Sequence, residues 1–199
     1  ALHHTADPRG NMSALDRRTA LLDAAVGEIA SRGTRGMRIE QVARAAGVSP
    51  ALIYHHFGDR STLLQHALEH IGARAETYTT VIGADAHDTV LAVLLAEIQD
   101  VETVRINSAA WGELRDAAIF DEALRPIITS LTTRWAADVA ALARAGQHDG
   151  SITATRDAEA LGVQLTALVE GISSRWLTGQ LTTTEARAHV TSVAGSLLR

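Results

Sequence analysis

The stretch over residues 39–64, IEQVARAAGVSPALIYHHFGDRSTLL, constrains the fold of this chain more than any other part of the sequence. Its apolar residues recur at helical spacing, but Gly47 and Gly58 interrupt that spacing within a few turns. Ser49 and Pro50 form a helix-start signal between them, because serine is a frequent N-cap and proline fits the first helical turn. The stretch therefore predicts two short helices followed by a longer one. A two-turn helix is marginal alone, so these helices must pack against longer neighbours, as in a helix-turn-helix.

The same helical spacing continues through the rest of the chain, with three prolines and few period-two runs, so the sequence predicts an all-α protein. S-x-x-D at Ser13 and T-x-x-E at Thr182 predict capping boxes, and Gly33 is expected to end the first helix. We expect an N-terminal three-helix helix-turn-helix domain over 13–60 and a larger C-terminal helical domain over 61–199. The predicted helices span about 14–33, 39–46, 50–57, 60–80, 85–100, 103–117, 121–146, 156–178 and 183–198, with D-G turn chemistry marking a loop at 146–151.

Composition and charge exclude several classes of protein. Cysteine is absent, which excludes disulfides, thiolate metal sites and a cysteine nucleophile and fits a reducing compartment. No apolar run reaches the roughly 18 residues that a spanning helix needs. Residues 1–13 lack the apolar core of a signal peptide, so we expect a cytoplasmic protein with no membrane partner.

Charge is distributed unevenly along the chain. Residues 1–70 carry eight arginines and seven acidic residues (+1), and the remainder carries ten arginines and sixteen acidic residues (−6), which sum to the net charge of −5. The remainder would repel a phosphate backbone. A local footprint for nucleic acid is therefore expected only in the first third of the chain.

The predicted helix over 50–57 has one apolar face. Ile53 and Phe57 lie four residues apart and should face the bundle. The other side chains would then face outward, with small residues at the N-terminal end, where a recognition helix approaches the major groove. The alternative is that Tyr54 and His56 only close a small core, because tyrosine and histidine are often half-buried.

The outward residues divide by the part of DNA that each could contact. Amide groups after Ser49 lie at the positive end of a helix and attract phosphate, and the Tyr54 hydroxyl and Arg60 could also reach the phosphate backbone. Leu52 and His55 are better candidates for touching base edges, since leucine can contact a thymine methyl group.

Residues 13–66 resemble the DNA-binding domain of the TetR (tetracycline repressor) family. The resemblance rests on a long pattern of fixed spacing, carried by Val42, Ala43, Ala46, Gly47, Val48, Ser49, Tyr54, His56, Phe57, Leu63 and Leu64. Arg60 stands where the family usually has lysine, which keeps the charge but changes the geometry of its donors. Arg38 stands where the family often has a capping threonine, so it could contact phosphate but cannot cap the helix in the same way.

The resemblance implies a homodimeric, ligand-responsive transcriptional regulator, usually a repressor, that places two recognition helices on a palindromic double-stranded DNA operator. Half-sites roughly 34–36 Å apart, or a multiple of that spacing, require a two-fold dimer. The helix over 60–80 would transmit the binding of an unknown small-molecule effector, and this coupling must be reciprocal. The residues expected to bind DNA are Arg38, Ser49, Pro50, Ala51, Leu52, Tyr54, His55, His56 and Arg60.

In the TetR family the effector binds inside the C-terminal domain, where this chain carries its remaining large aromatic residues. Trp111 is the preferred lining residue, although a lone tryptophan in a helical bundle is more often core than ligand wall. Glu97 and Arg105 could orient a polar ligand if they point inward, but charged residues on helices are usually solvated. The residues expected to bind the effector are Glu97, Ile98, Arg105, Trp111 and Phe120.

Two helices near the C-terminus are predicted to form the dimer interface. The helix over 156–178 carries a stripe of small residues beside its leucine face, and small residues allow close helix approach. With the helix over 183–198, two helices from each subunit would make a four-helix interface; the alternative is that both stripes bury within one subunit. The C-terminal half is similar, through GQHDGSI and ALVEGISSRWL, to TetR members related to the betaine-pathway repressor. The residues expected at the interface are Val163, Ala167, Gly171, Ser174, Val190, Val193 and Leu197.

The sequence contains no phosphate-binding glycine loop, dinucleotide-binding glycine motif, nucleophile elbow or H-E-x-x-H zinc motif. His66 and His70 lie at i, i+4, a spacing that can hold a metal, but no third ligand is evident, and His3 and His4 lie in the expected N-terminal arm. We therefore expect no enzyme, no cofactor and no metal site. Two other hypotheses stay open: a helical ligand-binding or protein-interaction dimer with a vestigial helix-turn-helix, and a cofactor-independent enzyme.

Overall fold

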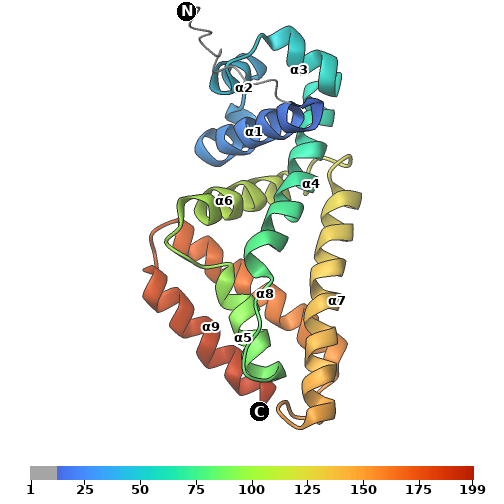
Figure 1. Ribbon diagram of the computed structural model, residues 1–199. Coiled ribbons are helices and arrows are strands. Elements are labelled where there is room, and N and C mark those ends of the chain that lie inside the picture. Colours follow the sequence, from blue (N-terminus) through green and yellow to red (C-terminus); the bar gives the residue numbers. More distant parts are fainter. Residues whose placement is uncertain (1–12) are drawn as a thin grey trace, which may run out of the picture.

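The protein is all-α over residues 13–199, the part of the chain that this computed structural model describes (Figure 1). The all-α prediction is therefore confirmed for these residues, whereas His3 and His4 lie outside them. The helices are α1 (Ala14–Gly36), α2 (Ile39–Ala46), α3 (Pro50–Phe57), α4 (Arg60–Thr79), α5 (Ala86–Ala96), α6 (Glu102–Ala117), α7 (Arg125–Asp149), α8 (Ala158–Leu177) and α9 (Thr183–Leu198).

Local capping signals set most helix ends as predicted. Both capping boxes are present: the Ser13 hydroxyl accepts a hydrogen bond from the Asp16 amide, and the Thr182 hydroxyl accepts one from the Glu185 amide. Helices α2 and α3 span the predicted residues. Helix α7 begins at Arg125 rather than near residue 121, because proline in its first turn favours a start at that point.

The predicted C-terminal ends of three helices were wrong, and one of them is α5, which ends at Ala96 rather than near residue 100. Helix α1 does not stop at Gly33 but kinks there, with φ 71° and ψ 167°, and continues to Gly36. That conformation is essentially restricted to glycine. Helix α7 runs through the predicted loop to Asp149, and Gly150 ends it in the left-handed conformation at φ 85°. The buried Gly146 instead packs against Ile152, which folds back from the loop.

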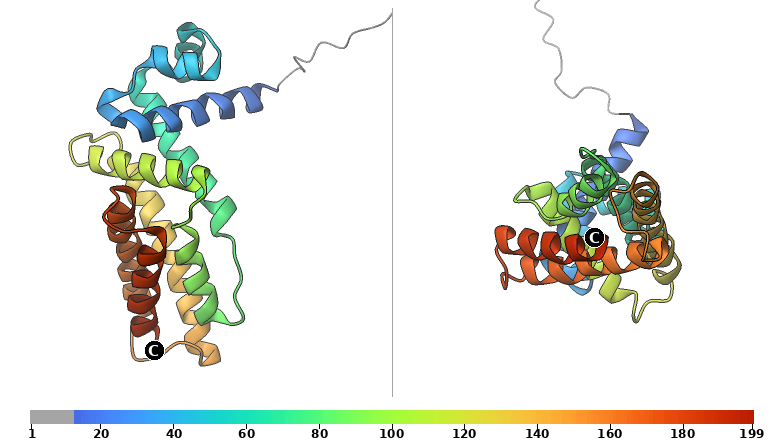
Figure 2. Two further views of the ribbon diagram at one scale, coloured as in Figure 1. Left: turned by 90° about the vertical axis from the view of Figure 1, so that its left-hand side faces the viewer. Right: turned by 90° about the horizontal axis from the view of Figure 1, so that it is seen from below.

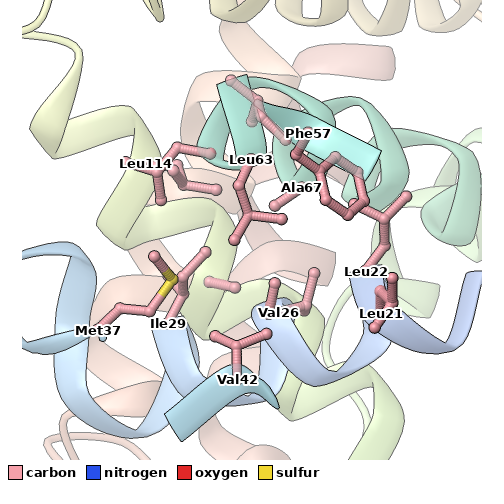
Figure 3. Packing of buried hydrophobic residues seen from close by; sticks show 14 of the residues in the cluster. Leu21, Leu22, Val26, Ile29, Met37, Val42, Phe57, Leu63, Ala67 and Leu114 are labelled. Atoms are coloured by element: carbon pink, nitrogen blue, oxygen red, sulfur yellow. The ribbon is translucent and has the colours of Figure 1, made fainter. Parts of the chain in front are cut away.

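A first hydrophobic core joins the helix-turn-helix to the helices beneath it. Leu22, Val26 and Ile29 of α1 meet Leu63 of α4 and Leu114 of α6, as Figure 3 shows. All five side chains are at most 8% exposed. The predicted boundary between residues 60 and 61 falls inside this core, because α4 and α6 both contribute to it.

A second core is built by α5, α7, α8 and α9, which form the lower half of the molecule in Figure 1. Leu161, Leu165 and Trp176 of α8 are at its centre, each no more than 1% exposed. Helices α7 and α8 approach so closely at Gly162 that a β-carbon there would lie 2.2 Å from the Ala136 carbonyl oxygen. Figure 2 shows α8 and α9 side by side along one edge of this half.

None of the helices within residues 13–199 combines the length and the hydropathy that are needed to cross a lipid bilayer. Several helices are long enough, but their charged residues and polar faces lower the mean hydropathy of every window. Their apolar residues are instead gathered on the faces that build the two cores.

Candidate functional site

Helix α3 holds one face against the first core and turns the other outward. Ile53 and Phe57 are 1% and 4% exposed, which confirms the prediction that they face the bundle. The rest of the helix surface carries the residues expected to contact DNA. Ser49, Pro50, Ala51, Tyr54 and His55 are exposed, while Leu52 and His56 are partly exposed.

Ser49 is the N-cap residue of α3, as the sequence predicts, but it does not cap the helix through its side chain. The hydroxyl makes no capping hydrogen bond, because the Leu52 amide that it would satisfy donates instead to the Ser49 carbonyl oxygen at 3.1 Å. The Ser49 side chain is therefore exposed and free of an intrahelical role at the start of α3.

Two arginines near α3 are anchored on the end of α1. Arg38 Nη1 donates to the Arg35 carbonyl oxygen at 2.8 Å and makes no capping bond to α2, as its chemistry predicts. The Arg60 guanidinium, at the first position of α4, donates to the Thr34 carbonyl oxygen. Both guanidinium groups keep further N–H donors for another acceptor.

A cavity of about 360 Å³ lies between α4, α6, α7 and α8. Three of its lining residues are aromatic: Tyr78, Trp111 and Trp135. Six carboxylates line it against two arginines, so the formal charge of the wall is negative; these acidic residues are Glu76, Glu97, Glu113, Asp116, Asp138 and Glu170.

A polar network closes one part of this cavity. The Tyr78 hydroxyl donates to Glu97 Oε2 at 3.4 Å and accepts from Asn107 Nδ2 at 2.9 Å. Burial raises the pKa of Glu97 to about 7, and the hydrogen bond from Tyr78 offsets part of that rise. Burial and the adjacent Glu97 carboxyl also raise the pKa of Tyr78, so its hydroxyl stays protonated.

Two buried polar atoms in the cavity wall lack hydrogen-bond partners among the described residues. They are Asn107 Oδ1, an acceptor, and Trp135 Nε1, a donor. Asn107 is only 2% exposed, and its amide nitrogen donates to the Ile71 carbonyl oxygen at 3.2 Å, which fixes the orientation of the amide. Because unpaired buried polar groups are costly, these two atoms favour a ligand with complementary groups.

Another part of the cavity wall is organised around Glu170. Trp111 Nε1 donates to Glu170 Oε1 at 3.0 Å, and Arg115 lies 3.8 Å from the same carboxylate. Asn107, Trp111 and Arg115 recur every four residues along α6 and all line the cavity. That spacing was visible in the sequence and could have identified Asn107, but no short-range signal links α6 to Glu170.

Of the five residues expected to bind the effector, the structure places Glu97 and Trp111 in the cavity wall and the other three elsewhere. Ile98 is fully buried in the second core. The Arg105 guanidinium stacks 4.5 Å over the Trp176 ring and pairs with Asp100. Phe120 is 80% exposed in the loop between α6 and α7. Arg105 lies on a face of α6 that turns away from the cavity, whereas Ile98 and Phe120 lie outside the helices, in the connections after α5 and α6.

The small-residue stripe of α8 is exposed over its length. Val163 is 61% exposed, and Ala167, Gly171 and Ser174 are exposed as well, although Ser174 also lines the cavity. On α9, Val193 is 42% exposed.

Leu197 on α9 is partly exposed, but Val190 is fully buried in the second core, so placing it on the outer surface was wrong. It lies on the same face of α9 as Ala186 and Ala194, which are buried too.

Two family models match the chain. Residues 21–67 match the model described as bacterial regulatory proteins, tetR family. Residues 86–199 match the model described as BetI-type transcriptional repressor, C-terminal. The two matches together include α3, the cavity-lining helices α6 to α8, and the exposed stripe of α8.

Individual relatives agree with these matches. The HTH-type transcriptional regulator BetI of Brucella suis biovar 1 is 32% identical over 99 residues, which cover 48% of this chain and 50% of that protein. The match thus spans about half the length of that curated relative.

Solved structures match over more of the chain. A Rhodococcus structure assigned to the TetR family of transcriptional regulators is 42% identical with a TM-score of 0.85, covering 92% of this chain and 98% of the other. A transcriptional regulator of Saccharomonospora viridis in complex with choline is 25% identical with a TM-score of 0.80, covering 92% and 97%.

Proposed function

This chain belongs to the TetR family of bacterial regulatory proteins, and from that premise we propose that it is a ligand-responsive transcriptional repressor. It acts in the cytoplasm as a homodimer, binds a palindromic double-stranded operator and releases it when a small molecule occupies the cavity. The division at residue 60 separates a DNA-binding domain from an effector-binding and dimerisation domain in function, although one core connects them.

The observation that carries the DNA-binding proposal is the outward face of α3. Its inner face is fixed by Ile53 and Phe57, so the exposed side chains are presented on a rigid element. Small residues at the start of α3 let its backbone approach the major groove, where Leu52 and His55 face base edges. Arg38 and Arg60 flank the helix and supply phosphate contacts.

The exposed stripe of α8, together with the outer face of α9, is the proposed homodimer surface. Val163, Ala167 and Gly171 lie on one side of α8, and their small side chains allow a second copy of the helix to approach closely. Val193 and Leu197 extend the surface onto α9. Two helices from each subunit would then form a four-helix interface.

The chemistry of the cavity supports an organic cation as effector. Carboxylates exceed arginines in its wall, and the rings of Trp111 and Trp135 can lie against a cationic group. Asn107 Oδ1 and Trp135 Nε1 would pair with a hydroxyl group, which both donates and accepts a hydrogen bond. A related regulator has been crystallised with choline, which carries both a cationic group and a hydroxyl group.

Selection of bound sequences from a random duplex pool tests the DNA-binding proposal. We expect a palindrome, because a two-fold dimer presents α3 twice. Affinity for that palindrome should fall steeply with salt, with a slope of about −0.9 in log K against log salt for each neutralised phosphate.

The same experiment separates the alternatives. Neither a vestigial helix-turn-helix nor an enzyme acting in the cavity would select a sequence. Recovery of no enriched sequence from the pool would count against the repressor proposal.

A further inference from the structure

The kink at the end of α1 is held from two sides by charged side chains of other helices. On one side, Glu113 Oε2 of α6 accepts a hydrogen bond from the Thr34 amide at 3.2 Å. On the other side, the Arg60 guanidinium of α4 donates to the Thr34 carbonyl oxygen. Thr34 is 8% exposed, whereas Glu113 and Arg60 are exposed, so both bonds are partly buried at the surface of the molecule.

Glycine at position 33 makes the bond to Glu113 sterically feasible. A β-carbon on Gly33 would lie 2.8 Å from Glu113 Oε2, closer than real side chains come. The kink also turns the Thr34 amide out of the helical hydrogen-bond pattern, so it needs an acceptor from elsewhere. The carboxylate supplies that acceptor, and a hydrogen bond to a charged group is stronger than a neutral one.

The orientation of the Arg60 side chain depends on Thr34, whose carbonyl oxygen accepts its hydrogen bond. Arginine has about 2 kcal/mol of rotamer entropy to lose when a phosphate immobilises it. A guanidinium already fixed to the Thr34 carbonyl oxygen has lost part of that freedom before DNA arrives. It keeps other N–H donors for a phosphate oxygen, since guanidinium has five.

Helix α6 connects this junction to the cavity. Ala110 and Leu114 face the first core and pack against α1, whereas Asn107 and Trp111 line the cavity. Glu113 itself lines the cavity and makes no ion pair with any described residue, so its carboxylate is committed to Thr34. A shift of α6 would therefore move the acceptor that holds Thr34.

We propose that Glu113 is a positioning residue, which acts through Thr34 to hold the Arg60 guanidinium in the orientation that meets a DNA phosphate. The inference rests on the proposed DNA-binding function and adds a route from the cavity wall to the DNA surface. Breaking the bond between Glu113 and Thr34 weakens operator binding through the loss of one phosphate contact.

A double-mutant cycle on full-length protein tests this role. The probe is the duplex selected by the wild-type chain, and affinity is measured between low and moderate salt. Arg60→Ala should weaken binding about tenfold and reduce the salt slope by about 1. Glu113→Ala should weaken operator binding about three- to tenfold and lower the salt slope by a similar amount to Arg60→Ala. When Glu113→Ala is added to Arg60→Ala, operator affinity should fall little further.

Three further variants keep the cycle interpretable. Glu113→Gln retains an acceptor and should stay within about twofold of wild type. Glu113→Asp keeps the charge but shortens the side chain by one methylene group, so its operator affinity should match that of Glu113→Ala. If thermal unfolding shows that Glu113→Ala has a folding defect, Glu113→Asp takes its place in the cycle. Glu102→Ala removes an exposed acid from the same helix and should not weaken binding.

The results separate this inference from the proposed function. The positioning role would be overturned if Glu113→Ala reduced operator affinity equally in the presence and the absence of Arg60, or did not reduce it at all. Either result would leave the DNA-binding proposal intact. A wild-type chain that binds no duplex would overturn the proposed function itself, and the positioning role with it.

Discussion

At the scale of single residues, the Glu97 carboxyl group is withdrawn from water, and its hydrogen-bond partner, Tyr78, carries no positive charge that could neutralise a carboxylate. Its carboxyl accepts a hydrogen bond from Tyr78, and none of the ion pairs among residues 13–199 includes it. Burial disfavours the charged form and raises the pKa to about 7. Glu97 therefore holds its proton over part of the physiological pH range, and a cation bound beside it would favour release of that proton.

This linkage predicts a pH-dependent affinity for choline. Below pH 7 the proton must leave Glu97 before the carboxylate can pair with the cation, so affinity should rise with pH, by up to about tenfold per unit, and level off above about pH 7. Calorimetric titration between pH 5.5 and 8, a range chosen to bracket about pH 7, measures the effect.

Glu97→Gln supplies the control, because glutamine keeps the shape and the hydrogen bond but does not titrate. Choline affinity of this variant should be weaker than wild type above pH 7 and nearly independent of pH. The neutral analogue with a tert-butyl group in place of trimethylammonium should gain nothing from rising pH. A flat profile for choline on wild-type protein would remove Glu97 from the proposed cation site.

At the scale of elements, the junction of α7 with α8 depends on residues that have no side chain. Gly162 lets the Ala136 carbonyl oxygen approach the α8 backbone, and Gly146 makes room for Ile152. Helical spacing in the sequence identified the apolar face of α8, but it did not show which glycine lies at a crossing point. Local periodicity cannot identify the glycine at a helix crossing, because every glycine is a weak helix former whatever it packs against.

Replacement of Gly162 by alanine should destabilise the fold. A β-carbon at 2.2 Å from the Ala136 oxygen would force α7 and α8 apart. Overpacking of this kind costs about 1–3 kcal/mol, which corresponds to roughly 2–12 °C in Tm for a chain of this length.

Gly27→Ala in α1 is the matched control, since a β-carbon added there would have no described atom within 4 Å and alanine favours the helix by up to about 1 kcal/mol. Differential scanning calorimetry should therefore show opposite shifts for the two variants. An unchanged Tm for Gly162→Ala would mean that the helices can separate without loss.

At the scale of the whole molecule, the two cores lie one above the other, with α4 extending from the first towards the second and α6 lying crosswise beneath α1 (Figure 1). The cavity lies between them, so a ligand there contacts helices that belong to both halves. The outer stripe of α8 remains exposed after both cores are complete, which is the physical reason for assigning it to a second copy of the chain.

Substitution of tryptophan for Gly171 should dissociate the proposed dimer. Gly171 is exposed and a β-carbon added there would have no described atom within 4 Å, so we expect the folded monomer to tolerate a side chain at this position. Across a close helix–helix contact, the same side chain would hold the two subunits apart.

Sedimentation equilibrium should give about twice 21.1 kDa for wild type and about that monomer mass for Gly171→Trp. Ala141→Trp on the exposed face of α7 should remain dimeric. Dimeric Gly171→Trp protein would place the interface elsewhere.

The sequence by itself determined the features that depend on neighbours a few residues away. Capping residues located both capping boxes, Gly47 and Gly58 delimited α2 and α3, and i, i+4 spacing identified the buried face of α3. These features follow from backbone hydrogen bonding and side-chain direction within one or two turns, so they are encoded locally.

Only the tertiary structure decided which helix covers each face. Periodicity groups residues on a face, but it does not say whether that face meets a core, a cavity or solvent. Ile98 and Val190 therefore proved to be core residues, and Phe120 proved to be exposed. The kink at Gly33 has the same origin: the glycine suggested a helix end, whereas contacts with Glu113 and Arg60, distant in sequence, hold the chain through the kink.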